Sequence, residues 1–356
     1  MKLLNYFIII VVLISSCKKD EENTPSFDEN YGEGMYVVTD LGIGFYNHQD
    51  STAELISQIY EMVNNTTLNN PKKIKFKGEK AYILCDDYIV VADVKTFEDN
   101  GMISGFVNPL DFDFISDNRL FVADADDSKV KEVDLTRMEI TSDIETGDST
   151  RPVFIISNSY KSFVLNGGRL ASQSKDSTVA VIEYRDDLVS LANFEGSLLV
   201  GDNPNSGIIT SDGELKILCK GIYDPTNSNN NTEASLSNIN QYSNVVYSTD
   251  NLSGIYNAKN LISNYDNSSC YFTASDGIYS LNPNNLNFSF IVDVNASVIN
   301  TIVESYAVND STIGYSEMLY MNDMDSPNSI YKYNIALSSF VDTITVGAEI
   351  KDINFY

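Results

Sequence analysis

The sequence predicts an all-β domain of tandem four-stranded units, a β-propeller, and three features support this prediction. Short runs that alternate apolar and polar residues recur along the chain, as expected of half-buried strands. A second strand-like run follows several of them at a constant offset. Finally, the last segment of the chain matches the strand that the first unit lacks, which predicts a closed ring.

The first strand of the unit begins at a proline in three copies. Residues 71–76 and 109–114 alternate apolar and polar side chains, and a third copy begins at Pro152. The second strand starts eleven residues after each proline, at Tyr82, Leu120 and Phe163. A third element ends in an Asp turn, at Asp93 and Asp134. A constant offset in three copies indicates a repeated supersecondary unit.

The second strand recurs elsewhere with an acidic or amide residue at its end, because such side chains cap turns. We assign second-strand ends to Asp40, Asp86, Asp124, Asn166, Asp202, Asp250, Asp276 and Asn322. Most intervals suit one blade of roughly 40–50 residues, but the 26 residues from Asp250 to Asp276 are too few. We therefore expect seven blades, with eight as the alternative.

The two ends of the domain complement each other. Residues 351–356 match a first strand with no second strand after it, whereas residues 35–38 match a second strand with no first strand before it. Pairing them completes one blade and closes the ring. Residues 52–62 fit either a short helix or the outer strand of that blade. We see no domain boundary within 34–356.

Residues 121–124 follow a proline-led strand and precede Val133 and Asp134, and in this arrangement they resemble the YVTN-type β-propeller repeat. The resemblance is good over 70–135 and weaker from there to 356. It is interrupted at 223–262 by a loop rich in Asn and Ser at 227–232, which leaves the blade count open. The resemblance implies a propeller lipoprotein of Bacteroidetes-type bacteria.

The amino-terminal sequence resembles a lipoprotein export signal. One lysine precedes an apolar run that is too short for a permanent membrane span. Residues 13–17 (LISSC) resemble a lipobox, which implies a signal peptide over 1–16 and lipidation of Cys17. The alternative is an ordinary signal peptide with a nearby cysteine. Residues 17–33 form the expected flexible tether, and 34–356 form the propeller.

The Lys-then-acidic pattern of 18–22 resembles the export signal of surface lipoproteins. We therefore expect an outer-membrane, lipid-anchored protein exposed at the cell surface, with periplasmic retention as the alternative. The formal net charge of -27 repels nucleic acids and argues against a role with DNA or RNA. Three cysteines beyond Cys17 (Cys85, Cys219 and Cys270) cannot all pair internally, and we assign no disulfide.

The sequence carries no recognisable catalytic constellation, which favours a non-enzymatic role without a cofactor. A Ser-His-Asp or Cys-His arrangement would have to use His48, the sole histidine, and no motif surrounds it. We interpret it as a surface or turn residue. Carboxylates are dense at 124–128 and 322–326, but we interpret these stretches as solvated turns, and metal binding is left open.

The turns after the second strands of a propeller lie on one face, around the channel. A polar ring with aromatic neighbours at such a face is a plausible ligand platform, and the alternative is that these residues simply make the turns. The candidate ligand-binding residues are Asp40, Asp86, Tyr88, Asp124, Asp126, Asn166, Asp202, Asn203, Asp250, Asn251, Asp276 and Asn322. Asn205 is a further amide neighbour.

Three functions follow as hypotheses. The first is a surface protein that binds a small molecule or nutrient. Propeller lipoproteins that this chain resembles act beside outer-membrane transporters and capture compounds such as cobalamin-like or siderophore-like molecules. The second is a scaffold for protein–protein interaction, which a large exposed apolar patch would favour. The third is a cation-dependent hydrolase or lyase, which converging carboxylates would favour. Fold alone does not decide between them.

Overall fold

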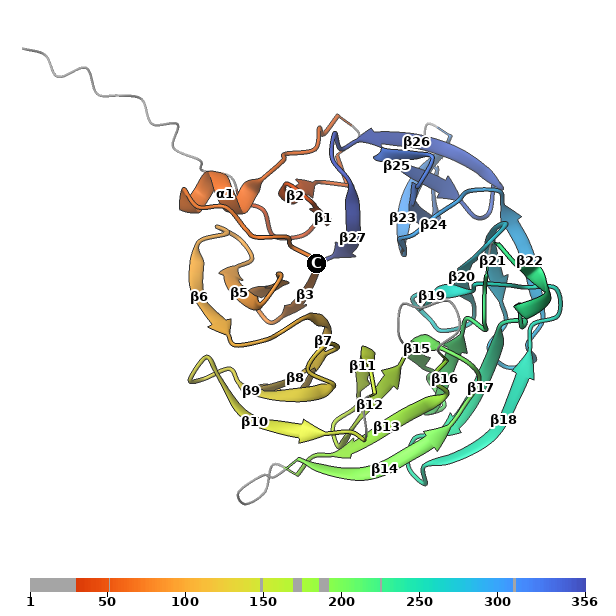
Figure 1. Ribbon diagram of the computed structural model, residues 1–356. Coiled ribbons are helices and arrows are strands. Elements are labelled where there is room, and N and C mark those ends of the chain that lie inside the picture. The colour runs from red at the N-terminus through yellow and green to blue at the C-terminus, as the bar shows by residue number, and fades with distance from the viewer. Residues whose placement is uncertain are drawn as a thin grey trace, which may run out of the picture.

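A computed structural model describes residues 30–50, 52–147, 150–168, 175–185, 192–224, 226–309 and 312–356. Seven antiparallel sheets are arranged radially around a central axis, so the chain is a seven-bladed β-propeller (Figure 1). This confirms the predicted fold class and the choice of seven blades over eight. We number the blades from the one that contains both chain ends.

Six blades have four strands each, in chain order from the axis outward. Blade 2 contains β3 (Lys73–Lys77), β4 (Lys80–Leu84), β5 (Tyr88–Asp93) and β6 (Asp99–Ser104), and blade 3 contains β7 (Pro109–Ser116), β8 (Arg119–Asp124), β9 (Lys129–Asp134) and β10 (Glu139–Glu145). Blade 4 contains β11 (Pro152–Ser157), β12 (Lys161–Asn166), β13 (Thr178–Glu183) and β14 (Asn193–Leu199), and blade 5 contains β15 (Pro204–Ile209), β16 (Glu214–Cys219), β17 (Ser235–Asn240) and β18 (Val245–Asn251). Blade 6 contains β19 (Lys259–Ser263), β20 (Cys270–Ala274), β21 (Gly277–Leu281) and β22 (Phe288–Val292), and blade 7 contains β23 (Ile299–Asn309), β24 (Thr312–Asp323), β25 (Ser326–Asn334) and β26 (Ser339–Thr345).

Blade 1 closes the ring as the two chain ends predicted. The C-terminal strand β27 (Ile350–Phe355) pairs antiparallel with β1 (Met35–Thr39), which in turn pairs with β2 (Gly42–Tyr46). The blade lacks a regular fourth strand, and a single bridge from Phe45 to Ile56 stands in its place. The helix expected over 52–62 is shorter and later, as α1 (Ile59–Asn64), so both alternatives for this segment are partly right.

Two of the eight assigned second-strand ends are wrong. Asp250 lies within β18, the outer strand of blade 5, and Asp202 lies in the loop that follows β14, the outer strand of blade 4. The second strand of blade 5 is β16, which ends at Cys219 without an acidic residue. Outer strands have the same sequence pattern as second strands, because they too end in polar turns. The outer strand that ends near Asp250 was therefore counted as a second strand, which gave the short interval of 26 residues to Asp276.

The register places two chain segments of each blade at the same face. Pro109 at the start of β7 pairs with Asp124 at the end of β8, and Pro152 pairs with Asn166 in the same way in blade 4. The start of every inner strand therefore lies beside the end of a second strand. We call the face where these ends meet the entry face.

Apolar side chains pack between neighbouring blades. Phe112 of blade 3 lies in one buried cluster with Ile89 of blade 2, and Phe121 of blade 3 shares another with Ile182 of blade 4. The packed part reaches into the segment assigned to the tether, because Tyr31 is buried against other aromatic rings. Burial of such large side chains between sheets supplies the main favourable term for the ring.

Candidate functional site

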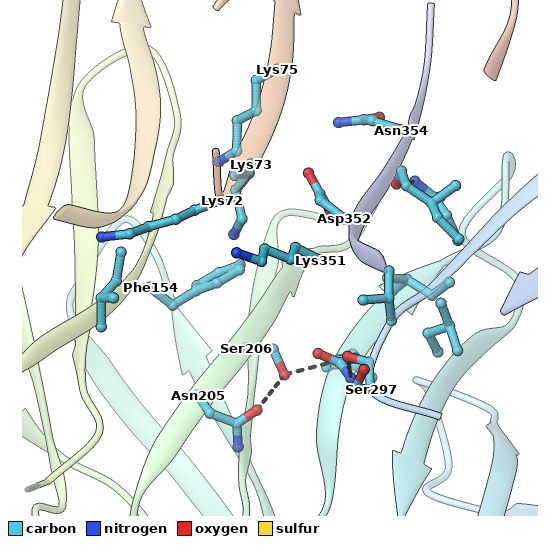
Figure 2. A pocket seen from close by; sticks show the side chains of 18 of the residues that line it. Lys72, Lys73, Lys75, Phe154, Asn205, Ser206, Ser297, Lys351, Asp352 and Asn354 are labelled. Carbon is cyan, nitrogen blue, oxygen red and sulfur yellow. Dashed lines mark hydrogen bonds between the residues drawn. The ribbon is translucent and has the colours of Figure 1, made fainter. Parts of the chain in front are cut away.

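The seven inner strands surround a cavity of about 470 Å³ on the axis of the ring (Figure 2). The cavity lies toward the entry face, because most of its lining comes from the first three residues of the inner strands and from the residues just before them, although it extends along β27 as far as Asn354. All seven blades contribute. The lining consists of Lys72, Lys73, Lys75, Leu110, Val153, Phe154, Asn205, Ser206, Asn260, Leu261, Ile262, Ser297, Val298, Ile299, Asn300, Lys351, Asp352, Ile353 and Asn354.

The charged lining residues come from neighbouring strands β3 and β27. They are four lysines and one aspartate, which are Lys72, Lys73, Lys75, Lys351 and Asp352. Figure 2 shows them at one side of the cavity together with Phe154. The Lys73 Nζ lies 5.5 Å from the centre of the Phe154 ring, within the range of a cation–π contact. The cavity thus combines positive charge, an aromatic ring and an apolar wall.

A buried carboxylate fixes two of these lysines. Asp111 Oδ1 lies 2.9 Å from the Lys73 Nζ and 3.1 Å from the Lys75 Nζ, and its side chain is fully buried. Burial alone would raise the pKa of Asp111, but the charges of Lys73 and Lys75 outweigh it and hold that pKa below its usual range. Asp111 is therefore ionised, and its single negative charge offsets part of the positive charge of these two lysines from behind the cavity wall.

Side chains of the inner strands also bond to the backbone of the next inner strand. Asp352 accepts a hydrogen bond from the Ile74 N–H at 3.1 Å, and Asp111 accepts one from the Ile155 N–H at 3.0 Å. Ser206 accepts from Leu261 at 2.9 Å in the same manner. Because each bond joins two blades beside the axis, the cavity wall is held by cross-links rather than by loops alone.

Asp352 differs electrostatically from its counterpart Asp111. Burial raises the pKa of Asp352, and the nearby charges of Lys73 and Lys75 offset this only in part. Its carboxyl group is thus the less acidic of the two, although both occupy the third position of an inner strand. The positive charge of the lining exceeds the negative charge even if Asp352 is ionised.

Lys351 has the least compensated charge of the four lining lysines. Its Nζ donates to Asn70 Oδ1 at 2.6 Å and has no carboxylate within ion-pair distance in the described ranges. By contrast, Lys72 donates to Asn108 Oδ1 at 2.9 Å and lies 3.6 Å from Asp86 Oδ1. Lys351 therefore has donor capacity left for a molecule in the cavity.

The sequence-predicted residues lie at the entry face as expected, but none of the twelve lines the cavity. Several are buried and make the turns. Asp124 accepts hydrogen bonds from Val107 and Asn108, and Asn322 accepts from Ser297 and Val298. Asn166 and Asn203 are buried as well. For Asp124, Asn203 and Asn322 the turn-making interpretation describes the contacts, since Asn203 accepts from the Asp176 N–H and donates to the Gly221 carbonyl oxygen. Asn166 instead donates to Thr178 Oγ1 on the paired strand β13 at 3.0 Å.

The remaining predicted residues are more accessible to solvent. Asp40, Asp86, Asp126, Asn251 and Asp276 are exposed, whereas Tyr88, Asp202 and Asp250 are half-buried. Asp40 accepts a hydrogen bond from the Glu349 N–H, and the Tyr88 hydroxyl accepts one from Asn69. A ligand-binding role for them stays a prediction. The lining lysines lie in segments that the sequence identified as inner strands, but their place in a cavity was not predicted. Asn205, which does line the cavity, was named only as an amide neighbour of the candidate residues.

His48 lies in a turn and is half-buried, as interpreted from the sequence. It borders a second cavity of about 460 Å³ together with Gln49, Val303, Glu304, Ser305 and Tyr315. Burial lowers its pKa. Within the described ranges, no group of three His, Cys, Asp or Glu side chains is placed to hold a metal ion.

The three cysteines Cys85, Cys219 and Cys270 are buried and unpaired. Cys17, the predicted lipidation site, lies outside the described residues. In the described part of the chain, no helix has the length and apolar character needed to cross a bilayer.

Comparisons with known proteins identify the fold but no family. No family model and no curated protein matches the chain. Among solved structures, it is similar to a quinoprotein alcohol dehydrogenase-like protein from Bacteroides thetaiotaomicron, with 15% identity, a TM-score of 0.67 and coverage of 92% of this chain and 79% of that one. A 6-phosphogluconolactonase-like protein from Bacteroides fragilis has 11% identity, a TM-score of 0.66 and coverage of 93% and 99%.

Hydrazine synthase from Kuenenia stuttgartiensis is a third similar structure, with 14% identity, a TM-score of 0.61 and coverage of 81% of this chain and 90% of that one. The names of these three proteins differ, and the identities are low. The likeness therefore establishes the class of protein, a seven-bladed β-propeller, and leaves its activity to the site.

Proposed function

We propose that this protein is a lipid-anchored surface lipoprotein that binds a small molecule in the cavity at the centre of the ring. The observation that carries the proposal is the cavity itself, to which all seven inner strands contribute polar and apolar side chains. Its volume of about 470 Å³ lies within the range of small-molecule sites, roughly 300–1,000 Å³. Cross-links between the inner strands favour a site formed before the ligand arrives.

The amino-terminal sequence supports the surface location. The lipobox-like residues 13–17 and the charged segment after Cys17 fit a lipidated protein on a tether. A binding domain held at the outer membrane could deliver a captured nutrient to a transporter, and we propose this accessory role by analogy with the resemblance to YVTN-type propeller lipoproteins.

Native mass spectrometry tests ligand binding. The full chain, purified in detergent, is mixed with a pool of vitamins, metal chelates, sugars and organic acids. We expect at least one bound mass that Leu110→Trp removes, because the larger ring at this lining position takes up part of the cavity and obstructs the ligand. Leu337→Trp is the matched control, since Leu337 is 56% exposed in the turn between β25 and β26. A ligand that both variants retain would place binding elsewhere.

Two cell experiments test the location. Inhibition of lipoprotein signal peptidase should leave an unprocessed precursor, and unchanged processing would refute lipidation of Cys17. Protease added to intact cells should release the propeller from the surface. Full protection, with digestion after the outer membrane is permeabilised, would favour the periplasmic alternative.

A further inference from the structure

A set of basic side chains lies at the entry face of five blades, and two of its members, Lys72 and Lys351, line the cavity. We call it the cation rim, and it consists of Lys72, Arg151, Lys220, Lys259 and Lys351. Each comes from a different blade, and each lies at the start of an inner strand or the end of a second strand. Five of the seven blades therefore present one cation at the mouth of the cavity.

Chain adjacency and one backbone hydrogen bond place the other three rim residues next to the lining. Lys259 is the first residue of β19 and precedes the lining residue Asn260. The Lys220 N–H donates to the Asn203 carbonyl oxygen at 3.1 Å, just before the start of β15. Arg151 directly precedes β11, whose residues Val153 and Phe154 line the cavity.

The cation rim is under-neutralised for a protein with a net charge of -27. Elsewhere in the described ranges basic side chains commonly have carboxylate partners, as Lys131 has in Asp127 and Asp143. In the same ranges Lys220, Lys259 and Lys351 have none within ion-pair distance, and Arg151 has a single one at 3.8 Å. Lys72 lies 3.6 Å from Asp86 Oδ1, so three of the five rim cations have no carboxylate partner in the described ranges, although carboxylates are abundant in this chain.

The rim cations also act on one another. Burial lowers the pKa of Lys220, and the positive charges of Lys259 and Arg151 lower it further. Like charges held together without counter-charges are unfavourable, and a bound anion would relieve their repulsion. A ring of cations around a cavity with low-dielectric walls also concentrates anions from solution.

Resting on the function proposed above, we propose that the ligand is a small anion whose carboxylate or phosphate group binds to Lys351 in the cavity, while Lys220 and Lys259 add positive charge at the entry face. Lys351 and Lys259 lie at the starts of β27 and β19, and Lys220 follows β16, so all three charges lie at the entry face. The rest of the molecule contacts Phe154 and the apolar wall deeper inside. Ammonium groups with unused donors suit either anionic group.

Isothermal titration calorimetry of the full chain in detergent tests this inference. The probes are citrate and glucose 6-phosphate, and their neutral counterparts are trimethyl citrate and glucose. We expect one anion to bind at low ionic strength, its neutral counterpart to bind at least about tenfold more weakly, and added salt to weaken the binding. Citrate and the sugar phosphate separate a carboxylate ligand from a phosphate ligand.

Charge variants locate the bound anion. Lys351→Gln should weaken binding by about tenfold or more, the loss of one charged hydrogen bond, and Lys259→Gln should weaken it by a smaller factor through the loss of a nearby positive charge. Lys80→Gln removes the same charge from an exposed hairpin away from the entry face and should leave affinity within about twofold. Unfolding temperatures of the variants show that each is folded.

The outcomes separate this inference from the proposed function. Binding of a neutral counterpart as tight as that of its anion, or binding unchanged in both lysine variants, would overturn the anionic site. If no anionic probe binds while mass spectrometry finds a neutral ligand in the cavity, the inference fails and the proposed function stands. If neither method finds a ligand, both fail.

Discussion

Loss of charge at two aspartates in equivalent places in the ring should destabilise the protein to very different extents. Asp111 and Asp352 each accept a backbone N–H from the next inner strand, and Asn can retain that hydrogen bond in either place. The pKa of Asp111 is lowered because Lys73 and Lys75 outweigh its burial, whereas burial raises the pKa of Asp352. We therefore expect Asp111→Asn to be the far more destabilising substitution.

The magnitude follows from the ion pairs that the variant breaks. Removing one partner of a buried pair costs about 3–5 kcal/mol. The lower end applies here, because the side chains of Lys73 and Lys75 are 25% and 23% exposed and can reach water. A domain of roughly 320 residues has an unfolding entropy of about 0.7 kcal/mol/K, so ~3 kcal/mol lowers Tm by about 4 °C. Asp352→Asn should cost ~1 kcal/mol or less.

Differential scanning calorimetry at pH 7 measures both variants. The dependence on pH adds a second readout, because a carboxyl group with a lowered pKa in the folded state stabilises the protein above its ordinary pKa of about 4 and loses that contribution as the pH falls. Asp111→Asn should therefore lose less stability between pH 5 and 3 than the parent protein does. A Tm loss for Asp352→Asn equal to that for Asp111→Asn would refute the assigned electrostatic difference.

Ring closure and the cysteines give two further predictions. Ile353→Ala truncates a side chain that is 2% exposed in the closing strand β27, and it should lower the free energy of unfolding, measured by chemical denaturation, by about 2–5 kcal/mol. Leu337→Ala, at an exposed turn, should lower it by under ~0.5 kcal/mol. Equal losses in the two variants would argue against the pairing of β27. Burial raises the pKa of Cys85, Cys219 and Cys270 to about 12. All three thiols should therefore resist a thiol reagent in the native protein and react after unfolding. Rapid labelling of any one of them in the native protein would contradict its burial.

The fold could be predicted because its determinants are local and repeated. A proline-led strand and a second strand at a fixed offset recur in blades 2 to 4, and each copy reinforces the same interpretation. Closure of the ring by residues 351–356 could be predicted because the amino-terminal unit lacks a first strand and the carboxy-terminal segment supplies one. The errors at Asp202 and Asp250 arose where outer strands have the same pattern as second strands, a distinction that depends on pairing rather than on composition.

The cavity residues could not be identified by the same means. Asp and Asn recur in the sequence because they form the turns of the blades. Asp124 and Asn322, however, bond to the backbone of these turns and do not line the cavity. Lys72, Lys351 and Phe154 lie far apart in the chain, and they meet only because three inner strands converge on the axis. Such convergence is tertiary, so the sequence predicted the face of the ring but not the residues or the positive charge of the site.

A crystal structure of the protein with the ligand identified by mass spectrometry tests the central claim most directly. We predict ligand density on the axis of the ring, with an anionic group within about 3 Å of the Lys351 Nζ and the remainder against Phe154. Density on an outer strand or between blades, with the axial cavity holding solvent alone, would contradict the site.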